Sequence, residues 1–162
     1  MEHVKVIRSE QVSIKYLHHS NLLVAPRLVS VGSVTPRKGH DVLVEALHRI
    51  RGMEWACVCA GSLGRGGDFP KRVRGRVPEL GLESRILFLG ELDAQELDRV
   101  YETASVFVLP SRFEGYGMAL TEALARGLPV VSTTGGAIPG TVPRDAGILV
   151  PPDDAEALAT AL

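Results

Sequence analysis

The sequence of 162 residues has only two cysteines, Cys57 and Cys59. They stand two positions apart in the apolar run 55–60, so both would lie on one face of a strand. Neighbouring positions on one strand would give a strained disulfide, and no further metal ligands cluster beside them. We therefore interpret both as buried core thiols, a usage that predicts a reducing, cytoplasmic setting.

Other features are also scarce, and their scarcity excludes classes of function. The 18 basic and 19 acidic residues leave a formal net charge of -1, so the chain has no bulk attraction for nucleic acid or an acidic membrane. No apolar run reaches the roughly 18 residues that span a bilayer, and the N-terminus does not resemble a secretory signal. A basic cluster at 65–76 lacks a series of interleaved aromatic side chains, which favours a solvated helix face. We expect no nucleic-acid partner; contact of a longer protein with a membrane stays open.

From about residue 25, short apolar runs alternate with amphipathic helical patterns. Strands are predicted at 28–34, 55–60, 86–89, 106–109, 130–133 and 148–150, and helices at 40–50, 69–80, 94–104 and 117–125, with a last helix capped by Asp153 or Asp154. Continuously apolar strands that alternate with helices predict an α/β fold, a Rossmann-like doubly wound parallel sheet of about six strands. The nearly all-apolar helix at 117–125 should be buried on most sides.

Residues 25–162 carry this rhythm and are expected to form one domain. Residues 1–24 do not, and we interpret them as a linker or a poorly defined N-terminal segment. The chain stops inside a predicted helix at Leu162, so we expect it to be a piece of a longer protein.

The segment 110–131 concentrates the features that carry chemistry. Two glycines in the Gly115-Tyr-Gly117 turn let the backbone approach a ligand, and the free N–H groups of Gly117, Met118 and Ala119 at the next helix start suit a diphosphate. Glu122 would lie roughly 8 Å from that start at about 1.5 Å per residue, the distance from a diphosphate to its ribose. Glu122 is therefore predicted to bind a ribose diol, and Glu114 a sugar on the other side of the phosphates. The alternative is a helix-capping Glu114 and a solvent-facing Glu122.

Lys38 follows the first strand, at the edge of the sheet where ligands bind. A positioned ammonium there would stabilise the negative charge that grows on a departing diphosphate. The alternative is a solvated lysine in a turn.

The segment resembles the donor-site signature of glycosyltransferase family 4: a glutamate, seven residues, a second glutamate, a small-residue helix and Gly-x-Pro-Val-Val. The resemblance extends from about Arg27 to Leu162 and includes 37–46, 59–61, 88–90 and the Gly135-Gly136 turn. It implies the GT-B fold, two Rossmann-like domains with the active site in the cleft between them, of which this chain resembles the C-terminal, donor-binding half.

The resemblance also implies a role for each site residue. Lys38 and Glu114 would be catalytic, Lys38 at the diphosphate and Glu114 at the hydroxyls of the transferred sugar. The implied donor-binding residues are Arg37, Gly61, Gly90, Glu114, Gly115, Tyr116, Gly117, Met118 and Glu122. Family members commonly place an arginine soon after the glycine of the first strand, where this chain has Ser33, and Arg37 is the residue that might substitute. Gly140 also stands where glutamate is usual.

These observations predict transfer of a sugar from a nucleoside-diphosphate sugar to a hydroxyl acceptor, with retention and with neither metal nor cofactor. The implied partner is an N-terminal acceptor-binding domain, without which the chain should be inactive. The alternatives are a non-catalytic nucleotide-binding or scaffold domain, and a sugar-nucleotide epimerase of the same architecture.

Overall fold

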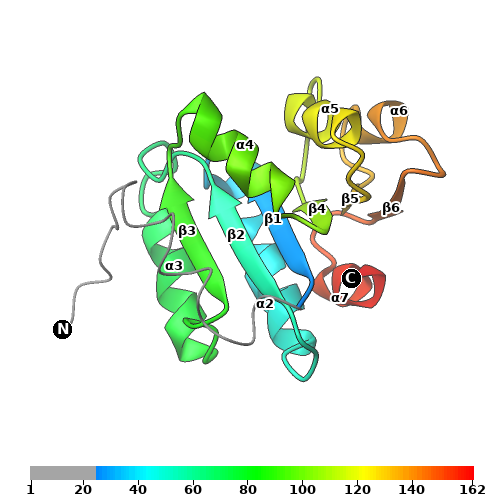
Figure 1. Ribbon diagram of the computed structural model, residues 1–162. Helices are drawn as coiled ribbons and strands as arrows, with labels where there is room; N and C mark the ends of the chain where they lie inside the picture. The colour runs from blue at the N-terminus through cyan, green and yellow to red at the C-terminus, as the bar shows by residue number, and fades with distance from the viewer. Residues whose placement is uncertain (1–24) are drawn as a thin grey trace.

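A computed structural model describes residues 25–162, which form one six-stranded sheet in the order β3-β2-β1-β4-β5-β6 (Figure 1). The strands are β1 (Arg27–Val31), β2 (Ala56–Ala60), β3 (Ile86–Gly90), β4 (Val106–Leu109), β5 (Val130–Thr133) and β6 (Gly147–Val150). All neighbouring strands run parallel. The predicted doubly wound sheet of about six strands is therefore confirmed. The segment 1–24, interpreted as a linker, lies outside the described residues.

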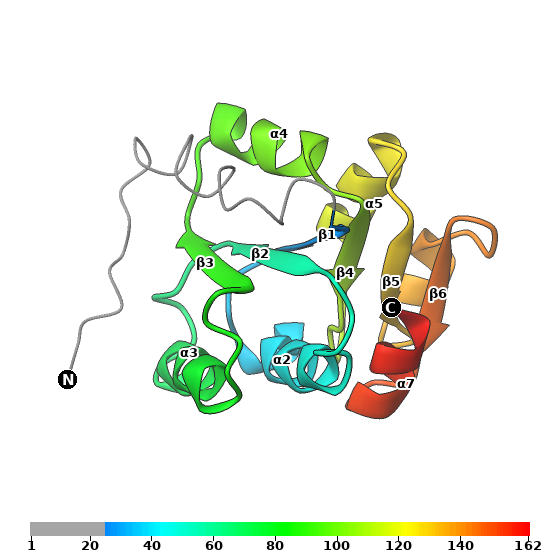
Figure 2. The ribbon, with the colours of Figure 1, turned by 60° about the horizontal axis from the view of Figure 1, so that its bottom comes forward.

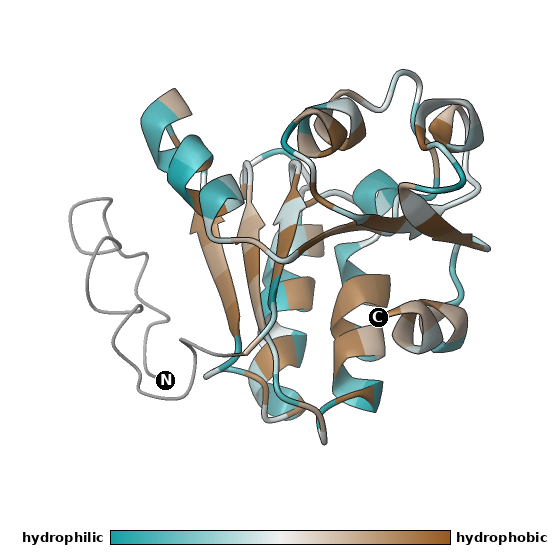
Figure 3. Cartoon of the chain, turned by 45° about the vertical axis from the view of Figure 1, so that its right-hand side comes forward, coloured by the Kyte–Doolittle hydropathy of each residue, from teal (hydrophilic) through white to brown (hydrophobic). Residues whose placement is uncertain are grey.

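Helices cover both faces of the sheet, as Figure 2 shows. They are α2 (His40–Arg49), α3 (Phe69–Glu79), α4 (Ala94–Glu102), α5 (Met118–Ala125), α6 (Ile138–Thr141) and α7 (Ala155–Ala161). One core joins α2, α3 and α7 to the sheet, and a second core joins α4, α5 and α6 to the opposite face. The strands are apolar along most of their length because they are covered from both sides (Figure 3).

Local sequence accounts for where the helices begin and end. Asp93 and Glu96 form a reciprocal capping box at the start of α4. Asp154, one of the two predicted caps, accepts a hydrogen bond from the backbone of Ala157 at 2.8 Å and starts α7. Pro78 lies in the last turn of α3, and the end of this helix is closed by Gly81, which has a left-handed φ of 69° and donates its N–H to the Pro78 carbonyl.

The core contains both cysteines, as the sequence predicts. Cys57 and Cys59 are free and buried in β2. A hydrogen bond with Cys59, and then burial, raise the pKa of the Cys57 thiol. No helix between residues 25 and 162 has the length and apolar composition needed to cross a bilayer.

The expectation that the helix at 117–125 is buried on most sides is wrong. In α5 only Leu120 and Ala123 are buried, and Met118 is 79% exposed. The inner side of α5 packs on the sheet, but no second layer of the described chain covers its outer side. Two short elements were not predicted, the single turn η2 (Pro36–Lys38) and α6, because each is too short to show a repeating apolar pattern.

Candidate functional site

The candidate site lies at the carboxyl ends of β1 and β4. These two strands are neighbours in the sheet although they are far apart in the sequence, since the chain reverses its direction of winding between them. At such a switch point the loops after the two strands diverge and leave a crevice in which open α/β sheets bind ligands. Here those loops are 32–39 and 110–117.

Arg37, Lys38 and Glu114 meet across this switch point, and we call them the site cluster. Lys38 Nζ donates to Glu114 Oε1 at 2.6 Å, and Arg37 Nη1 donates to Oε2 at 3.2 Å and to the Phe113 carbonyl at 2.9 Å. The Glu114 side chain is 6% exposed, that of Lys38 13% and that of Arg37 51%. Each carboxylate oxygen thus faces a cation, and three predicted site residues from opposite loops are brought together.

A buried hydroxyl adds to this cluster. Ser111, which is fully buried, donates to Glu114 Oε1 at 2.6 Å. Thr133, at the end of β5, donates to the backbone oxygen of Ser111 and accepts from Gly135 N at 3.1 Å. Burial opposes ionisation of Glu114, but the hydrogen bonds from Lys38 and Ser111 and the nearby positive charges outweigh it. The pKa of Glu114 therefore lies below its ordinary value, and the group is a carboxylate at neutral pH.

Glycines let the loops approach closely enough to hold Glu114 in place. A Cβ on Gly136 would stand 2.3 Å from the Glu114 carbonyl oxygen, which accepts a hydrogen bond from Ala137 N at 2.8 Å. A Cβ on Gly39 would stand 2.0 Å from the Pro110 carbonyl oxygen. Residues with side chains at these two positions would force the site loops apart.

The start of α5 lies directly after this carboxylate. Gly117 is its N-cap in a left-handed conformation, φ 68°, and no side chain caps this end. The side chains of Tyr116 and Met118 are exposed, and a Cβ on Gly115 would meet nothing within 4 Å. Helix starts carry free N–H groups and a partial positive charge. An uncapped helix start, with exposed side chains on either side of the buried Gly117, therefore lies where the sequence predicts the phosphates.

Three glycines at the ends of β1, β2 and β3 differ in their surroundings, and two of them, Gly61 and Gly90, are predicted site residues. Gly32 lies under the stem of Lys38, whose Cε would be 3.3 Å from an added Cβ, so the lysine crosses the end of β1. Gly61 does provide a close approach, but to the chain itself, because its Cβ would stand 2.2 Å from the Gly32 carbonyl oxygen. Gly90, at φ 75°, faces open space at the end of β3. For Gly61 and Gly90, contact with a donor stays a prediction.

Glu122 makes no contact with Glu114 and belongs to a separate cluster. Arg126 donates to Glu122 Oε1 at 3.3 Å and to Asp98 Oδ1 at 2.6 Å, and its guanidinium lies 4.6 Å from the centre of the Tyr101 ring. Burial, and then the charge of Glu122, raise the pKa of Tyr101. The Glu122 side chain is 41% exposed, so it is open to a ligand, and its role at a ribose stays a prediction.

Sequence reasoning missed the supporting residues Ser111 and Arg112. Arg112 donates its backbone N–H to the Arg37 carbonyl at 2.8 Å, and so links the two site loops. Their position in the sequence could have indicated their importance, since both residues lie between the end of β4 and Glu114. That loop borders the crevice in which a ligand binds at the switch point of the sheet. Ser111 bonds to Glu114 only three residues away, whereas the side-chain partners of Arg112 lie 41 to 76 residues away and could not be read from the sequence.

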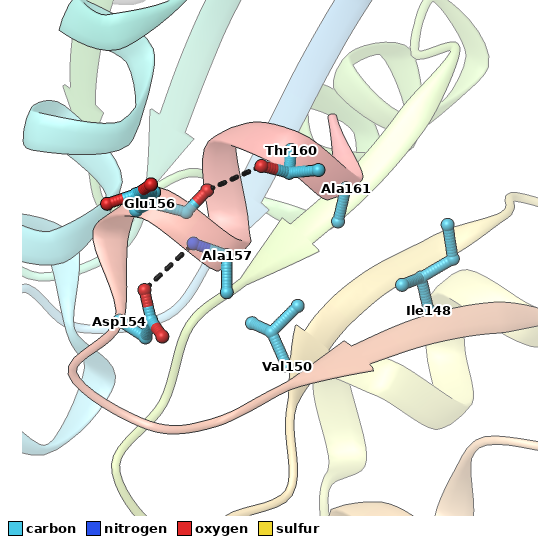
Figure 4. A pocket seen from close by; sticks show the side chains of 7 residues that line it. All are labelled: Ile148, Val150, Asp154, Glu156, Ala157, Thr160 and Ala161. Carbon is cyan, nitrogen blue, oxygen red and sulfur yellow. Dashed lines mark hydrogen bonds between the residues drawn. The ribbon is translucent and has the colours of Figure 1, made fainter.

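Two further surfaces do not join the site. Most of the basic cluster is neutralised locally, by the pairs Arg65 with Glu91, Lys71 with Asp68, and Arg76 with Glu45 and Glu79. A shallow hollow between β6 and α7 is lined by Ile148, Val150, Asp154, Glu156, Ala157, Thr160 and Ala161 (Figure 4), none of which is a predicted site residue. Within residues 25–162, no group of three or more His, Cys, Asp or Glu side chains is arranged to hold a metal ion.

Comparison with known proteins gives a consistent set of matches. The family model described as glycosyl transferases group 1 matches residues 25–162. The D-inositol 3-phosphate glycosyltransferase of Mycobacteroides abscessus is 34% identical over 133 residues, which are 82% of this chain and 30% of that protein. The sucrose-phosphate synthase of Thermosynechococcus elongatus superposes with a TM-score of 0.77 at 34% identity, over 94% of this chain and 37% of that one.

A third similar protein is HepE of Anabaena, whose structure was solved in complex with UDP and glucose. It superposes with a TM-score of 0.75 at 25% identity, over 83% of this chain and 36% of that one. In all three comparisons this chain spans about a third of the length of the protein it matches.

Proposed function

We propose, because this chain belongs to the family of group 1 glycosyl transferases, that residues 25–162 are the donor-binding half of a retaining glycosyltransferase of the family 4 type. The donor is a nucleoside-diphosphate sugar and the acceptor is a hydroxyl group. The observation that carries this proposal is the site cluster, in which Arg37 and Lys38 converge on the buried Glu114 at the switch point of the sheet.

The site cluster suits a substrate that is both anionic and rich in hydroxyl groups. The diphosphate of the donor lies against Lys38, Arg37 and the free N–H groups at the start of α5. Glu114, a carboxylate at neutral pH, accepts hydrogen bonds from the hydroxyls of the sugar. Complexes of the Anabaena HepE protein with UDP and glucose support this class of ligand, because that protein is a structural neighbour of the chain.

Catalysis in this scheme is electrostatic. As the bond between the sugar and the diphosphate breaks, negative charge accumulates on the leaving group, and a fixed ammonium at Lys38 stabilises that charge more than it stabilises the bound donor. Lys38 is well placed for this because its stem is packed over Gly32 and its side chain is largely buried. Lys38 and Arg37 supply the positive charge, so the proposal includes no metal ion and no cofactor.

The remaining features of the proposal concern the rest of the protein. Glu122 binds the ribose, and the loop at Gly90 borders the base. An acceptor-binding domain completes the cleft, and without it the chain binds donor but does not turn it over. We place the reaction in the cytoplasm on the strength of the two free, buried thiols.

Titration of this chain with UDP, GDP and ADP tests the proposal. We expect one of the three to bind, and Lys38→Ala to weaken that binding about ten-fold or more, the effect of losing one charge-assisted hydrogen bond. The Glu122→Ala variant should weaken nucleoside binding while leaving the response to inorganic diphosphate unchanged. Lys71→Ala, at a lysine that is 83% exposed on α3, is the matched control and should bind as the wild type does.

Failure of all three nucleotides to bind a folded protein would contradict the proposal and favour a scaffold role. Folding is checked in the same samples by the fluorescence of Trp55, the only tryptophan of the sequence.

A further inference from the structure

We propose that Arg112 is a positioning residue, which holds the segment that carries Arg37 and Lys38 so that both cations reach Glu114. The inference rests on the proposed function only where it assigns those cations to a diphosphate. The positions of Arg37 and Lys38 relative to Glu114 do not depend on which ligand binds.

The segment η2 has little structure of its own. It is a single 3-10 turn, closed by backbone hydrogen bonds from Lys38 N to Thr35 O at 3.0 Å and from Gly39 N to Pro36 O at 3.3 Å. No side chain caps its start. Because isolated 3-10 turns have poor hydrogen-bond geometry, the position of this one has to be set by contacts with the rest of the fold.

Arg112 supplies those contacts through two successive carbonyl groups of the turn. Its backbone N–H donates to the Arg37 oxygen at 2.8 Å, and its Nη1 donates to the Pro36 oxygen. These bonds fix the turn at the residues next to Lys38. The direction in which Lys38 leaves the backbone therefore depends on Arg112.

The guanidinium is itself held by two carboxylates, and we call Arg112, Asp41 and Asp153 the Arg112 cluster. Nη1 and Nη2 donate to the two oxygens of Asp41 at 3.1 and 2.9 Å, and Nε donates to Asp153 Oδ1 at 2.6 Å. A bidentate pair fixes the plane of the guanidinium as well as its distance. Asp41 lies in the first turn of α2, and Asp153 follows β6, so η2, α2 and the segment after β6 all contact one side chain.

Arg112 is not itself available to a phosphate. Four of its five side-chain N–H donors are used, one at Nε, two at Nη1 and one at Nη2. The hydrogen bond to Asp41, followed by the other contacts with Asp41 and Asp153, raises the pKa of Arg112 although burial opposes this. Its charge is therefore more than balanced by the two carboxylates, and its effect on a ligand passes through Arg37 and Lys38.

Arg112 also stands two residues before Glu114, so it belongs to the loop that carries the carboxylate. Its own carbonyl oxygen is pressed against Gly135, where an added Cβ would lie 2.3 Å away. One residue thus fixes both sides of the ion pair relative to each other.

The first test measures the pKa of Glu114 by carbon NMR of the labelled carboxyl group, without any nucleotide. Arg112→Ala removes the side-chain bonds to Pro36, Asp41 and Asp153 but keeps the backbone bond to Arg37. The turn η2 should therefore loosen, so that Glu114 keeps its burial while its cations are held less closely, and the pKa of Glu114 should rise above the wild-type value. The matched control is Arg76→Ala on α3, which likewise removes an arginine that is paired with two carboxylates. If Arg112→Ala unfolds the chain, Asp41→Asn removes one charge and one acceptor from the same fork and should also raise the pKa of Glu114, by a smaller amount.

A pKa of Glu114 that is unchanged in the folded variants would overturn the proposal, because a residue that serves stability alone would not move it. The Arg112→Lys variant retains the charge without the fork and should behave like Arg112→Ala. If lysine restored the wild-type pKa, the argument from fork geometry would be wrong.

The second test measures binding of UDP, GDP and ADP to the same variants. Arg112→Ala should weaken binding about ten-fold by displacing a charge-assisted contact, and Arg76→Ala should leave it unchanged. Unchanged affinity in Arg112→Ala would overturn the link between Arg112 and the ligand. If no nucleotide binds the wild type, the proposed function fails, and the pKa of Glu114 still decides the role of Arg112.

Discussion

Replacing Lys38 by methionine removes one charge of the site cluster with little change in shape. Methionine has a flexible unbranched side chain, so it retains the apolar contact over Gly32 that the lysine stem makes. The Glu114 carboxylate then stays buried with one cation fewer. This variant therefore isolates the electrostatic part of the interaction that carries the proposed function.

The expected loss of stability follows from the surroundings of Glu114. Removing one partner of a buried ion pair costs about 3–5 kcal/mol, because a charge is left without compensation. Arg37 at 3.2 Å and Ser111 at 2.6 Å stay in place, so we expect the lower end, about 3 kcal/mol. For a chain of this size that corresponds to a fall in Tm of about 6–12 °C.

Urea unfolding followed by the fluorescence of Trp55 measures this loss. Trp55 is 4% exposed and stacks under the Arg85 guanidinium at 3.7 Å, so unfolding changes its environment. The double variant Lys38→Met with Glu114→Gln removes both charges and should recover about 2 kcal/mol, since the uncompensated charge is gone. Lys71→Met is the surface control and should cost less than about 0.5 kcal/mol.

Two results would refute this reasoning. One is a loss for Lys38→Met that is no larger than the loss for Lys71→Met. The other is a double variant as unstable as the single one, which would mean that Glu114 does not depend on the lysine charge.

Two more predictions concern pH and backbone approach. His40 is fully buried, and burial, followed by the charge of Lys38, lowers its pKa from 6.5 to about 4. The unfolded chain takes up this proton first as the pH falls, so the free energy of unfolding should decrease by about 3 kcal/mol across that window. Urea unfolding of His40→Leu should show a flatter dependence there, and an unaltered slope would contradict the assignment. Gly136 and Gly127 both have left-handed backbones, with φ of 65° and 73°, but only Gly136 is crowded. Thermal unfolding should show that Gly136→Ala costs about 2 kcal/mol more than Gly127→Ala, and equal losses would contradict the close approach to the Glu114 carbonyl.

The architecture could be predicted from sequence because burial on both faces makes the strands of a parallel sheet continuously apolar. The fourth and fifth strands were placed without error, and the others to within a few residues. The parallel topology alone predicts that Lys38 and Glu114, which follow β1 and β4, lie at the same edge of the sheet. The burial of α5 was predicted incorrectly. An all-apolar helix pattern predicts burial on most sides, but it does not show whether the chain has another layer to cover the outer side.

The contacts that hold the site differ in how far they could be predicted from the sequence. The pair of Glu122 with Arg126 follows an i,i+4 spacing and could have been read directly. The bonds from Arg112 to Asp41 and Asp153 span 71 and 41 residues, and no periodicity links them. These bonds form because the segments that contain Asp41, Arg112 and Asp153 end at the same edge of the sheet. That placement is a property of the whole fold and is not encoded in any one segment.

The local distribution of charge favours the anion binding that we propose at the site, although the whole chain has a net charge of -1. The site cluster contains two cations and one carboxylate, so one positive charge remains beside the uncapped start of α5. The Arg112 cluster contains one cation and two carboxylates, and so carries the opposite balance. Arg37 is the second cation of the site cluster. Ser33 stands where family members commonly have an arginine, and we propose that Arg37 substitutes for that arginine. Because Arg37 is half exposed and Lys38 is largely buried, salt screens the first contribution far more than the second.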